Sequence, residues 1–269
     1  MTGLNASVER EVAVGDLTIS SMQRGTGRPL LVLHHSTGNA GWNRFYDLLA
    51  EDFEVIVPDL PGYGRSTMPE WAREPRDLAI LMLQYLRKLG LNDGVTLVGL
   101  GFGGWIAAEL ATMNHTPLSS MVLISAPGLR PEEGEIMDQM VIDPAEYARA
   151  GFRDAATAIQ QLGAEVDPEL VTLWQFNRVM TARVSWKPYM FSLRLPKLLA
   201  EVPTPVLLIN GSLDRVIPSA IPRQYERALP NAQRITMEGA GHLVEFEEPE
   251  RVVDLIKQHV HHPTPRLRA

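Results

Sequence analysis

VGLGFGGW, residues 98–105, is the stretch on which the interpretation of the whole chain depends. It lies between the apolar run 95–99, which is typical of a buried strand, and the pattern GWIAAELATMN (104–114), which is typical of a helix. A glycine-rich turn that joins a strand to a helix either binds a phosphate group or holds a nucleophilic side chain at a sharp bend. The central residue here is Gly101, which has no side chain.

The spacing of the glycines fits two patterns. Gly99, Gly101 and Gly104 match the G-x-G-x-x-G pattern of dinucleotide-binding folds, but three strand-like runs precede them, whereas that pattern normally opens the first strand-helix unit. The strand that follows ends in ISAP (124–127), without the acidic residue that would bind a ribose. A nucleophile elbow, G-x-S-x-G, fits better, because Gly99 and Gly103 supply its small residues. Glycine tolerates the strained apex, so the turn can persist without the serine.

Apolar runs and helical patterns alternate on both sides of this turn. Runs that are apolar on both faces are typical of parallel strands covered by helices, so the alternation predicts a doubly wound, mostly parallel α/β sheet. Two alternating segments around Gly15-Asp16 predict an antiparallel hairpin at the N-terminal side. The expected parallel strands are 30–33, 55–58, 95–99, 121–125, 205–210 and 234–237, and the expected helices between them are 42–52, 77–90, 104–114, 219–230 and 249–260.

The strand signal disappears between about Gly128 and Glu201. This block contains only consecutive helical patterns, at 135–140, 144–163, 168–182 and 188–200. A chain of 269 residues can form one large core with an insertion. We therefore predict an α/β core from residues 1–127 and 202–269, with 128–201 inserted as a helical cap.

Composition excludes several classes of protein. With 25 Lys and Arg against 32 Asp and Glu, the net charge of -7 argues against a nucleic-acid partner. The absence of cysteine excludes disulfides, thiolate metal sites and cysteine nucleophiles. The histidines lack metal-ligand spacing, so we expect no metal, and no cofactor is implied. A polar N-terminal segment and the lack of about 18 consecutive apolar residues predict a cytoplasmic protein that does not span a membrane.

Four further motifs occur in a characteristic order around the glycine turn. With it, they resemble the α/β-hydrolase fold family, of the capped kind that includes epoxide hydrolases and C-C hydrolases, and the resemblance covers nearly all of residues 8–261. The chain departs from the family where a His-Gly pair is replaced by His34-His35 and where the elbow serine is replaced by Gly101. The motifs are LLVLHHSTGNAGW (30–42), VIVPDLPGYGRS (55–66, with Asp59, Gly62, Gly64 and Ser66 in a D-x-x-G-x-G-x-S pattern), GSLDRVIP (211–218) and GAGHLVEFEEPE (239–250).

The resemblance implies a catalytic arrangement. Asp214 occupies the position of the family's triad acid and His242 that of its histidine, so the order nucleophile, acid, histidine is kept as 101, 214 and 242. Taken singly, Asp214 could be a helix N-cap and His242 a packed core residue, but their joint occurrence favours a functional pair. The backbone amides of Ser36 and Phe102 would form the oxyanion hole.

Without a serine at the apex, we expect His242, held by Asp214, to act as a general base. It would activate water in the space left by the missing side chain, or deprotonate the substrate. Hydrolysis of an ester, lactone or C-C bond fits this scheme, and so does lyase-type proton transfer. Ser36, and with less support Ser66 and Ser125, could instead supply a hydroxyl, although each could simply hydrogen-bond loop backbone.

Two other interpretations stay open. The chain could be an ordinary serine hydrolase that carries a Ser-to-Gly substitution at position 101, or a ligand-binding homologue without turnover.

In either case the partner is expected to be a small, partly apolar molecule, and the oligomeric state is undetermined by the sequence. One of His34 and His35 could be a core histidine that bonds to the backbone, and His35 is the one expected to reach the pocket. The expected substrate contacts are His35, which could donate to a substrate oxygen, and Trp105, Asn177 and Trp186.

Overall fold

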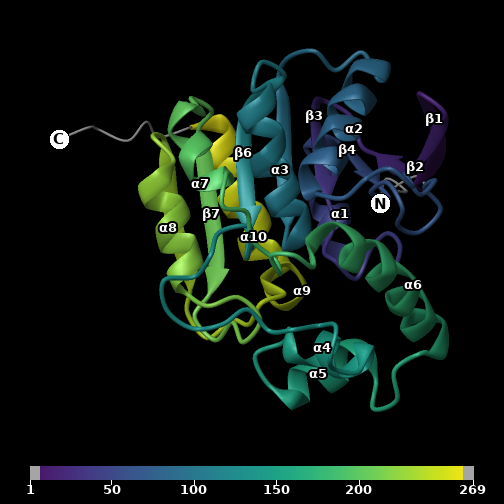
Figure 1. Cartoon of the computed structure of the whole chain (residues 1–269), viewed down its shortest axis with the longest axis vertical. Coiled ribbons are helices and arrows are strands. Elements are labelled where there is room, and N and C mark those ends of the chain that lie inside the picture. The colour runs from purple at the N-terminus through teal and green to yellow at the C-terminus, as the bar shows by residue number, and fades with distance from the viewer. Residues whose placement is uncertain (1–6, 263–269) are drawn as a thin grey trace.

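The computed structural model describes residues 7–262 and contains an eight-stranded sheet with helices on both faces (Figure 1). The strand order is β1-β2-β4-β3-β5-β6-β7-β8; β1 and β2 form the antiparallel hairpin, β2 is antiparallel to β4, and the remaining pairs are parallel. The predicted fold class is thereby confirmed. The strands are β1 (Val8–Val14), β2 (Leu17–Arg24), β3 (Arg28–Leu33), β4 (Phe53–Pro58), β5 (Val95–Leu100), β6 (Leu118–Ile124), β7 (Val206–Gly211) and β8 (Ala232–Met237).

Side chains of the central strands are buried on both faces of the sheet. In β3, Leu31 and Leu33 belong to one core cluster, whereas Leu30 and Val32 belong to the other. This explains the uninterrupted apolar runs of the sequence. The first cluster includes residues of α2 (Pro75–Lys88), α3 (Phe102–Met113) and α8 (Ala220–Ala228), and the second includes residues of α1 (Arg44–Leu49) and α10 (Pro249–His261).

Strand β3 lies at the topological switch point of the sheet, because its neighbours are β4 on one side and β5 on the other. In open α/β sheets, ligands bind in the crevice outside the carboxyl ends of the strands at such a point. The segment that follows β3 contains His34 and His35, and the turn that follows β5 contains Gly101. These two segments are therefore neighbours at the edge of the sheet where a site is expected.

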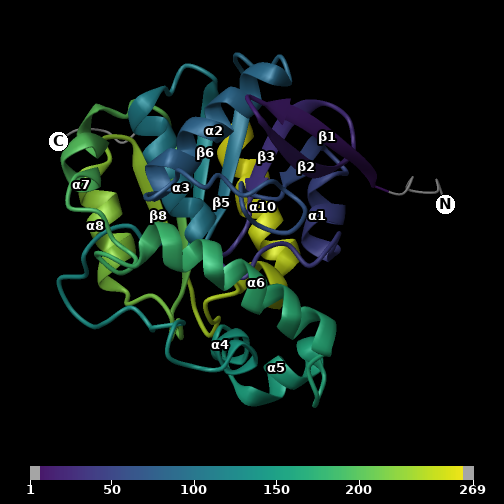
Figure 2. The ribbon, with the colours of Figure 1, turned by 45° about the vertical axis from the view of Figure 1, so that its right-hand side comes forward.

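The block 128–201 joins β6 to β7 and contains no strand of the sheet. Figures 1 and 2 show α4 and α5 together at one end of the molecule, with α6 next to them. The boundaries of a cap at 128 and 201 stay a prediction. The helices of this block are α4 (Pro144–Ala150), α5 (Ala155–Leu162), α6 (Pro168–Ser185) and α7 (Leu195–Leu198), followed by the 3-10 turn η1 (Leu199–Glu201).

Three helix predictions in this block were wrong. The segment 135–140 is not helical, because its backbone bonds to distant groups; for example, the amide of Met137 donates to the carbonyl of Val216. The expected helix 144–163 is two helices, since α4 ends at Ala150 with Gly151 as its C-cap, and Asp154 caps the start of α5 by accepting from the Thr157 amide. Residues 188–194 form isolated bridges and turns rather than a helix.

Candidate active site

The turn after β5 has the strained geometry of a nucleophile elbow. Gly101 has φ 48° and ψ −116° and is the N-cap of α3. A Cβ atom at Gly99 or Gly103 would collide with backbone atoms of α3 or of the end of β3, so both positions require glycine. The Gly103 amide donates to the carbonyl of His34 at 3.0 Å, which ties the elbow to the segment after β3.

Asp214 and His242 are in direct contact. Nδ1 of His242 donates to Oδ2 of Asp214 at 2.9 Å, and Oδ1 of Asp214 accepts from the amides of Val216 and Ile217, each at 2.8 Å. The carboxylate is thus oriented by the backbone of the loop after β7. Because Nδ1 carries the proton, Nε2 of His242 is the atom that can accept one.

Charges around His242 favour its protonated form. Burial opposes protonation, but the charge of Asp214, the hydrogen bond to it and the charge of Glu245 together outweigh burial and raise the pKa of His242 above its usual value. A raised pKa makes the neutral ring a stronger base.

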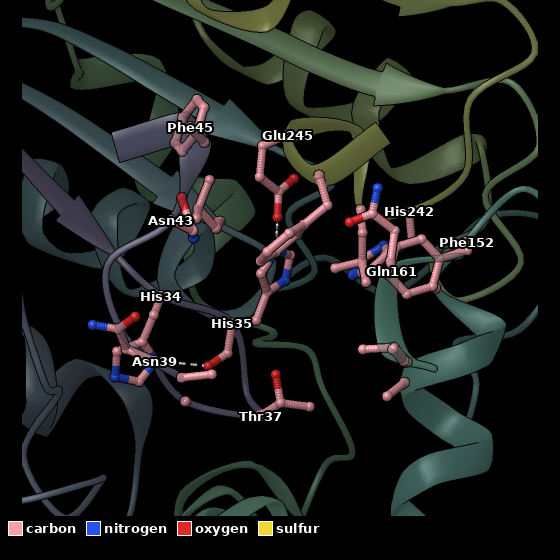
Figure 3. Close-up of a pocket in the computed structure, with 18 of the residues that line it drawn as sticks. His34, His35, Thr37, Asn39, Asn43, Phe45, Phe152, Gln161, His242 and Glu245 are labelled. Atoms are coloured by element: carbon pink, nitrogen blue, oxygen red, sulfur yellow. Dashed lines mark hydrogen bonds and ion pairs between the residues drawn. The ribbon is translucent and has the colours of Figure 1, made fainter. Parts of the chain in front are cut away.

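The ring of His35 fills the space at the apex of the elbow. A Cβ atom on Gly101 would collide with Nδ1 of His35. On its other side, the ring donates from Nε2 to Oε1 of Glu245 at 2.7 Å, and this carboxylate, in the short helix α9 (Val244–Glu247), is 1% exposed (Figure 3). The ring centroids of His35 and His242 are 5.3 Å apart. The expectation of an empty apex that would hold water was therefore wrong.

His34 holds the segment after β3 in place through two hydrogen bonds to backbone groups. Its Nδ1 donates to the carbonyl of His35 at 2.7 Å, and its Nε2 accepts from the amide of Leu60 at 2.9 Å. This second bond requires an unprotonated Nε2, so the ring is neutral. Burial lowers the pKa of His34 to about 4. The neutral ring fixes the backbone from which His35 extends.

The lowered pKa of His34 predicts acid destabilisation. As the pH falls from about 6.5 to about 4, the unfolded chain binds a proton that the folded protein excludes, so the free energy of unfolding decreases by about 3 kcal/mol from this residue. Asparagine can donate and accept but does not titrate. Denaturant unfolding of the wild type and of His34→Asn at several pH values should show a shallower pH slope for the variant in this window. Equal slopes would contradict the assignment.

A cavity of about 530 Å³ lies beside the two imidazole rings, within the usual size range for small-molecule sites. His35, Ser36, His242 and Glu245 line it, whereas Gly101 does not, because His35 covers it. The lining combines aromatic and aliphatic side chains with polar ones, and Figure 3 shows Asn39 and Gln161 on different sides of the two imidazole rings. Apolar lining residues include Phe45, Tyr46, Leu100, Tyr147, Phe152, Leu162, Trp174 and Leu243, and polar ones include Thr37, Asn39, Asn43 and Gln161.

Three of the residues expected to contact substrate do not line this cavity. Trp105 is buried in the core against Phe102, and Trp186 is 53% exposed and packs edge-on against Tyr189. Asn177 is buried and ties α6 to the segments after β3 and β4, since it donates to the carbonyl of Thr37 at 2.7 Å and accepts from the Gly64 amide at 3.0 Å. These positions do not support direct contact between the three residues and a substrate.

The serines considered as alternative nucleophiles have different surroundings. Ser66 accepts from the Ser20 amide and donates to the Asp59 carbonyl, so its hydroxyl is structural. Ser125 is buried and does not line the cavity. Ser36 does line it. The assignment of the amides of Ser36 and Phe102 to an oxyanion hole stays a prediction; Phe102 opens α3, where amides lack intrahelical acceptors.

Glu245 is the main site residue that the sequence did not reveal. It lies three positions after His242 in HLVEF (242–246), and an acidic residue inside this apolar run was the available signal.

Within residues 7–262, no group of three or more acidic residues, histidines or cysteines could hold a metal ion. Over the same residues, no helix has the length and apolarity that crossing a membrane requires.

Comparison with known proteins agrees with this geometry. The model of the alpha/beta hydrolase family matches residues 31–255, and the chain belongs to this family. It is 27% identical to a pimeloyl-[acyl-carrier protein] methyl ester esterase of Yersinia enterocolitica, over 86% of this chain and 93% of that protein. It is 23% identical to 2-hydroxy-6-oxo-6-(2'-aminophenyl)hexa-2,4-dienoic acid hydrolase of Metapseudomonas resinovorans, over 91% and 88%.

A solved structure shows the same fold over the full length. The 2-hydroxy-6-oxo-6-phenylhexa-2,4-dienoate hydrolase of Rhodococcus sp. strain RHA1 superposes with a TM-score of 0.75 at 19% identity, covering 95% of this chain and 99% of that one. The homologues thus include C-C hydrolases and esterases of the alpha/beta hydrolase superfamily.

Proposed function

We propose that the protein is a hydrolase of esters, lactones or C-C bonds in which His242, oriented by Asp214, activates a water molecule directly. The observation that carries this proposal is the buried hydrogen bond between Nδ1 of His242 and Asp214, which leaves Nε2 as the proton acceptor in a residue that lines the cavity. The raised pKa of His242 supports the role of base. General-base catalysis by such a group contributes about 10²–10⁴-fold to a rate.

The proposed reaction has one displacement instead of two. Water attacks the carbonyl carbon as Nε2 of His242 takes its proton, and no acyl group is attached to the protein. Backbone amides at the start of α3 and in the segment after β3 would stabilise the oxyanion, and they do not depend on the side chain at position 101. A small, partly apolar and aromatic substrate fits the lining of the cavity.

Two alternatives receive less support. An ordinary serine hydrolase with serine at position 101 would need the His35 ring to lie elsewhere, because a Cβ atom there meets Nδ1 of that ring. A binding homologue without turnover gives no reason for a histidine whose carboxylate partner raises its pKa. Lyase-type proton transfer would use the same base, and a substrate panel separates it from hydrolysis.

Treatment with a fluorophosphonate serine probe tests the proposal alongside that panel. We expect hydrolysis of at least one ester, lactone or vinylogous diketone, and no stoichiometric labelling, because no serine occupies the apex. Mass spectrometry after digestion locates any adduct. Stoichiometric labelling of Ser36 would replace water activation by nucleophilic catalysis, and binding of these compounds without turnover would favour the binding homologue.

A further inference from the structure

We infer that His35, held by Glu245, is the general acid of the reaction and donates a proton from Nδ1 to the leaving group. This inference rests on the proposed function. It assigns a second catalytic residue, whose ring lies at the apex of the elbow.

Hydrolysis by direct attack of water moves two protons, one from the water and one to the leaving group. In a two-step mechanism with an acyl-enzyme, one histidine takes a proton from the nucleophile and then gives it to the first leaving group. Direct attack by water also passes through a tetrahedral intermediate, so the proton taken from water and the proton given to the leaving group move in successive steps. His242 Nε2 could carry both protons only if it reached the water in the first step and the leaving oxygen in the second. A second proton donor placed beside the leaving group removes this requirement.

His35 lies where a second proton donor could serve the leaving group. Its Nδ1 lies against the apex of the elbow, within collision distance of a Cβ atom on Gly101. Its ring centroid is 5.3 Å from that of His242, and both rings line the same cavity. A carbonyl group that accepts water on the His242 side would therefore have its leaving group within reach of Nδ1 of His35.

Glu245 fixes which nitrogen of His35 acts. The carboxylate accepts from Nε2 at 2.7 Å, so Nδ1 is the nitrogen that exchanges its proton with a substrate. The other oxygen of Glu245, Oε2, is buried without a hydrogen-bond partner among the described residues. A buried carboxylate whose hydrogen-bonded partner is an imidazole stabilises the positive charge on that ring. His242 and Asp214 form the same kind of pair next to it.

The proton balance closes over one turnover. The cycle begins with a free Nε2 on His242 and a proton on Nδ1 of His35. The oxygen of water bonds to the carbonyl carbon while His242 Nε2 accepts one proton, and the bond to the leaving alkoxide breaks while His35 Nδ1 supplies one. The products are a carboxylic acid and an alcohol. A proton then passes from His242 to His35, which restores both rings, so no other reactant is needed.

A pair of esters with different leaving groups tests this assignment. An alkoxide leaves poorly without a proton, whereas 4-nitrophenolate leaves unaided. For His35→Gln, we expect kcat/KM to fall by about 10²–10⁴-fold on methyl phenylacetate and by at least tenfold less on 4-nitrophenyl phenylacetate. Glu245→Gln should shift the ratio of the two esters in the same direction.

His115→Gln is the matched control, because His115 is exposed and does not line the cavity, and it should change neither ester. Equal losses on both esters in His35→Gln and Glu245→Gln, or no loss on either, would overturn the general-acid role while leaving the base assignment intact. Thermal unfolding of each variant identifies a loss that comes from misfolding. If the wild type hydrolyses neither ester, nor any member of the substrate panel, the proposed function itself fails, and this inference fails with it.

Discussion

Replacing His242 with glutamine lowers kcat/KM by about 10²–10⁴-fold for every ester that the wild type hydrolyses, regardless of the leaving group. Glutamine keeps a polar group at Nε2 but cannot accept a proton from water. The loss should fall mainly on kcat, because the cavity lining is otherwise unchanged. A loss below tenfold would show that another group activates the nucleophile.

Asp214→Asn provides a second measurement on the same pair. The amide group can still accept from the Val216 and Ile217 backbone, but its nitrogen faces Nδ1 of His242 and favours the wrong tautomer. Removing the carboxylate charge also lowers the pKa of His242, because that charge helps to raise it. The rise of kcat/KM with pH should therefore move to lower pH, with a lower plateau. An unchanged profile would separate Asp214 from the titration of His242.

The sheet could be predicted from the sequence because burial on both faces leaves an unbroken apolar run. The six parallel strands were all found, and the hairpin at Gly15-Asp16 was found from its turn residues. The block between β6 and β7 was predicted less well. Helical periodicity at 135–140 and 188–194 is overridden by bonds to distant groups, such as the Gln139 amide to the hydroxyl of Tyr189, which a local pattern does not contain.

The candidate site was predictable only in part. The order of the motifs identified Asp214 and His242, and the structure brings their side chains together. The sequence also identified His35 as a departure from the family. Its occupation of the apex could not be predicted, because it depends on the direction of a side chain after β3 and on Glu245, 210 positions away. His35 and Gly101 are structurally coupled, since the ring at position 35 requires the absence of a side chain at position 101.

Gly101→Ser should therefore fail to create a serine hydrolase. The new Cβ collides with Nδ1 of His35, and φ of 48° is unfavourable for a residue with a side chain, so we expect a loss of about 1–3 kcal/mol in unfolding free energy. The His35 ring cannot turn aside freely, because it is buried and bonded to Glu245. Fluorophosphonate labelling should stay far below stoichiometric, and ester hydrolysis should not increase.

The combination Gly101→Ser with His35→Gly and Glu245→Gln should behave differently. Glycine at 35 frees the apex, and glutamine at 245 avoids a buried carboxylate without a partner. The serine hydroxyl then lies near His242, and we expect stoichiometric labelling at position 101 together with an acyl-enzyme burst on 4-nitrophenyl esters. The same combination with Gly101→Ala has the strain without the hydroxyl, so it should remain unlabelled. The single Gly101→Ser variant could instead be labelled stoichiometrically and gain activity. In that case the His35 ring does not fill the space beside residue 101, and an ordinary serine mechanism explains this active site better.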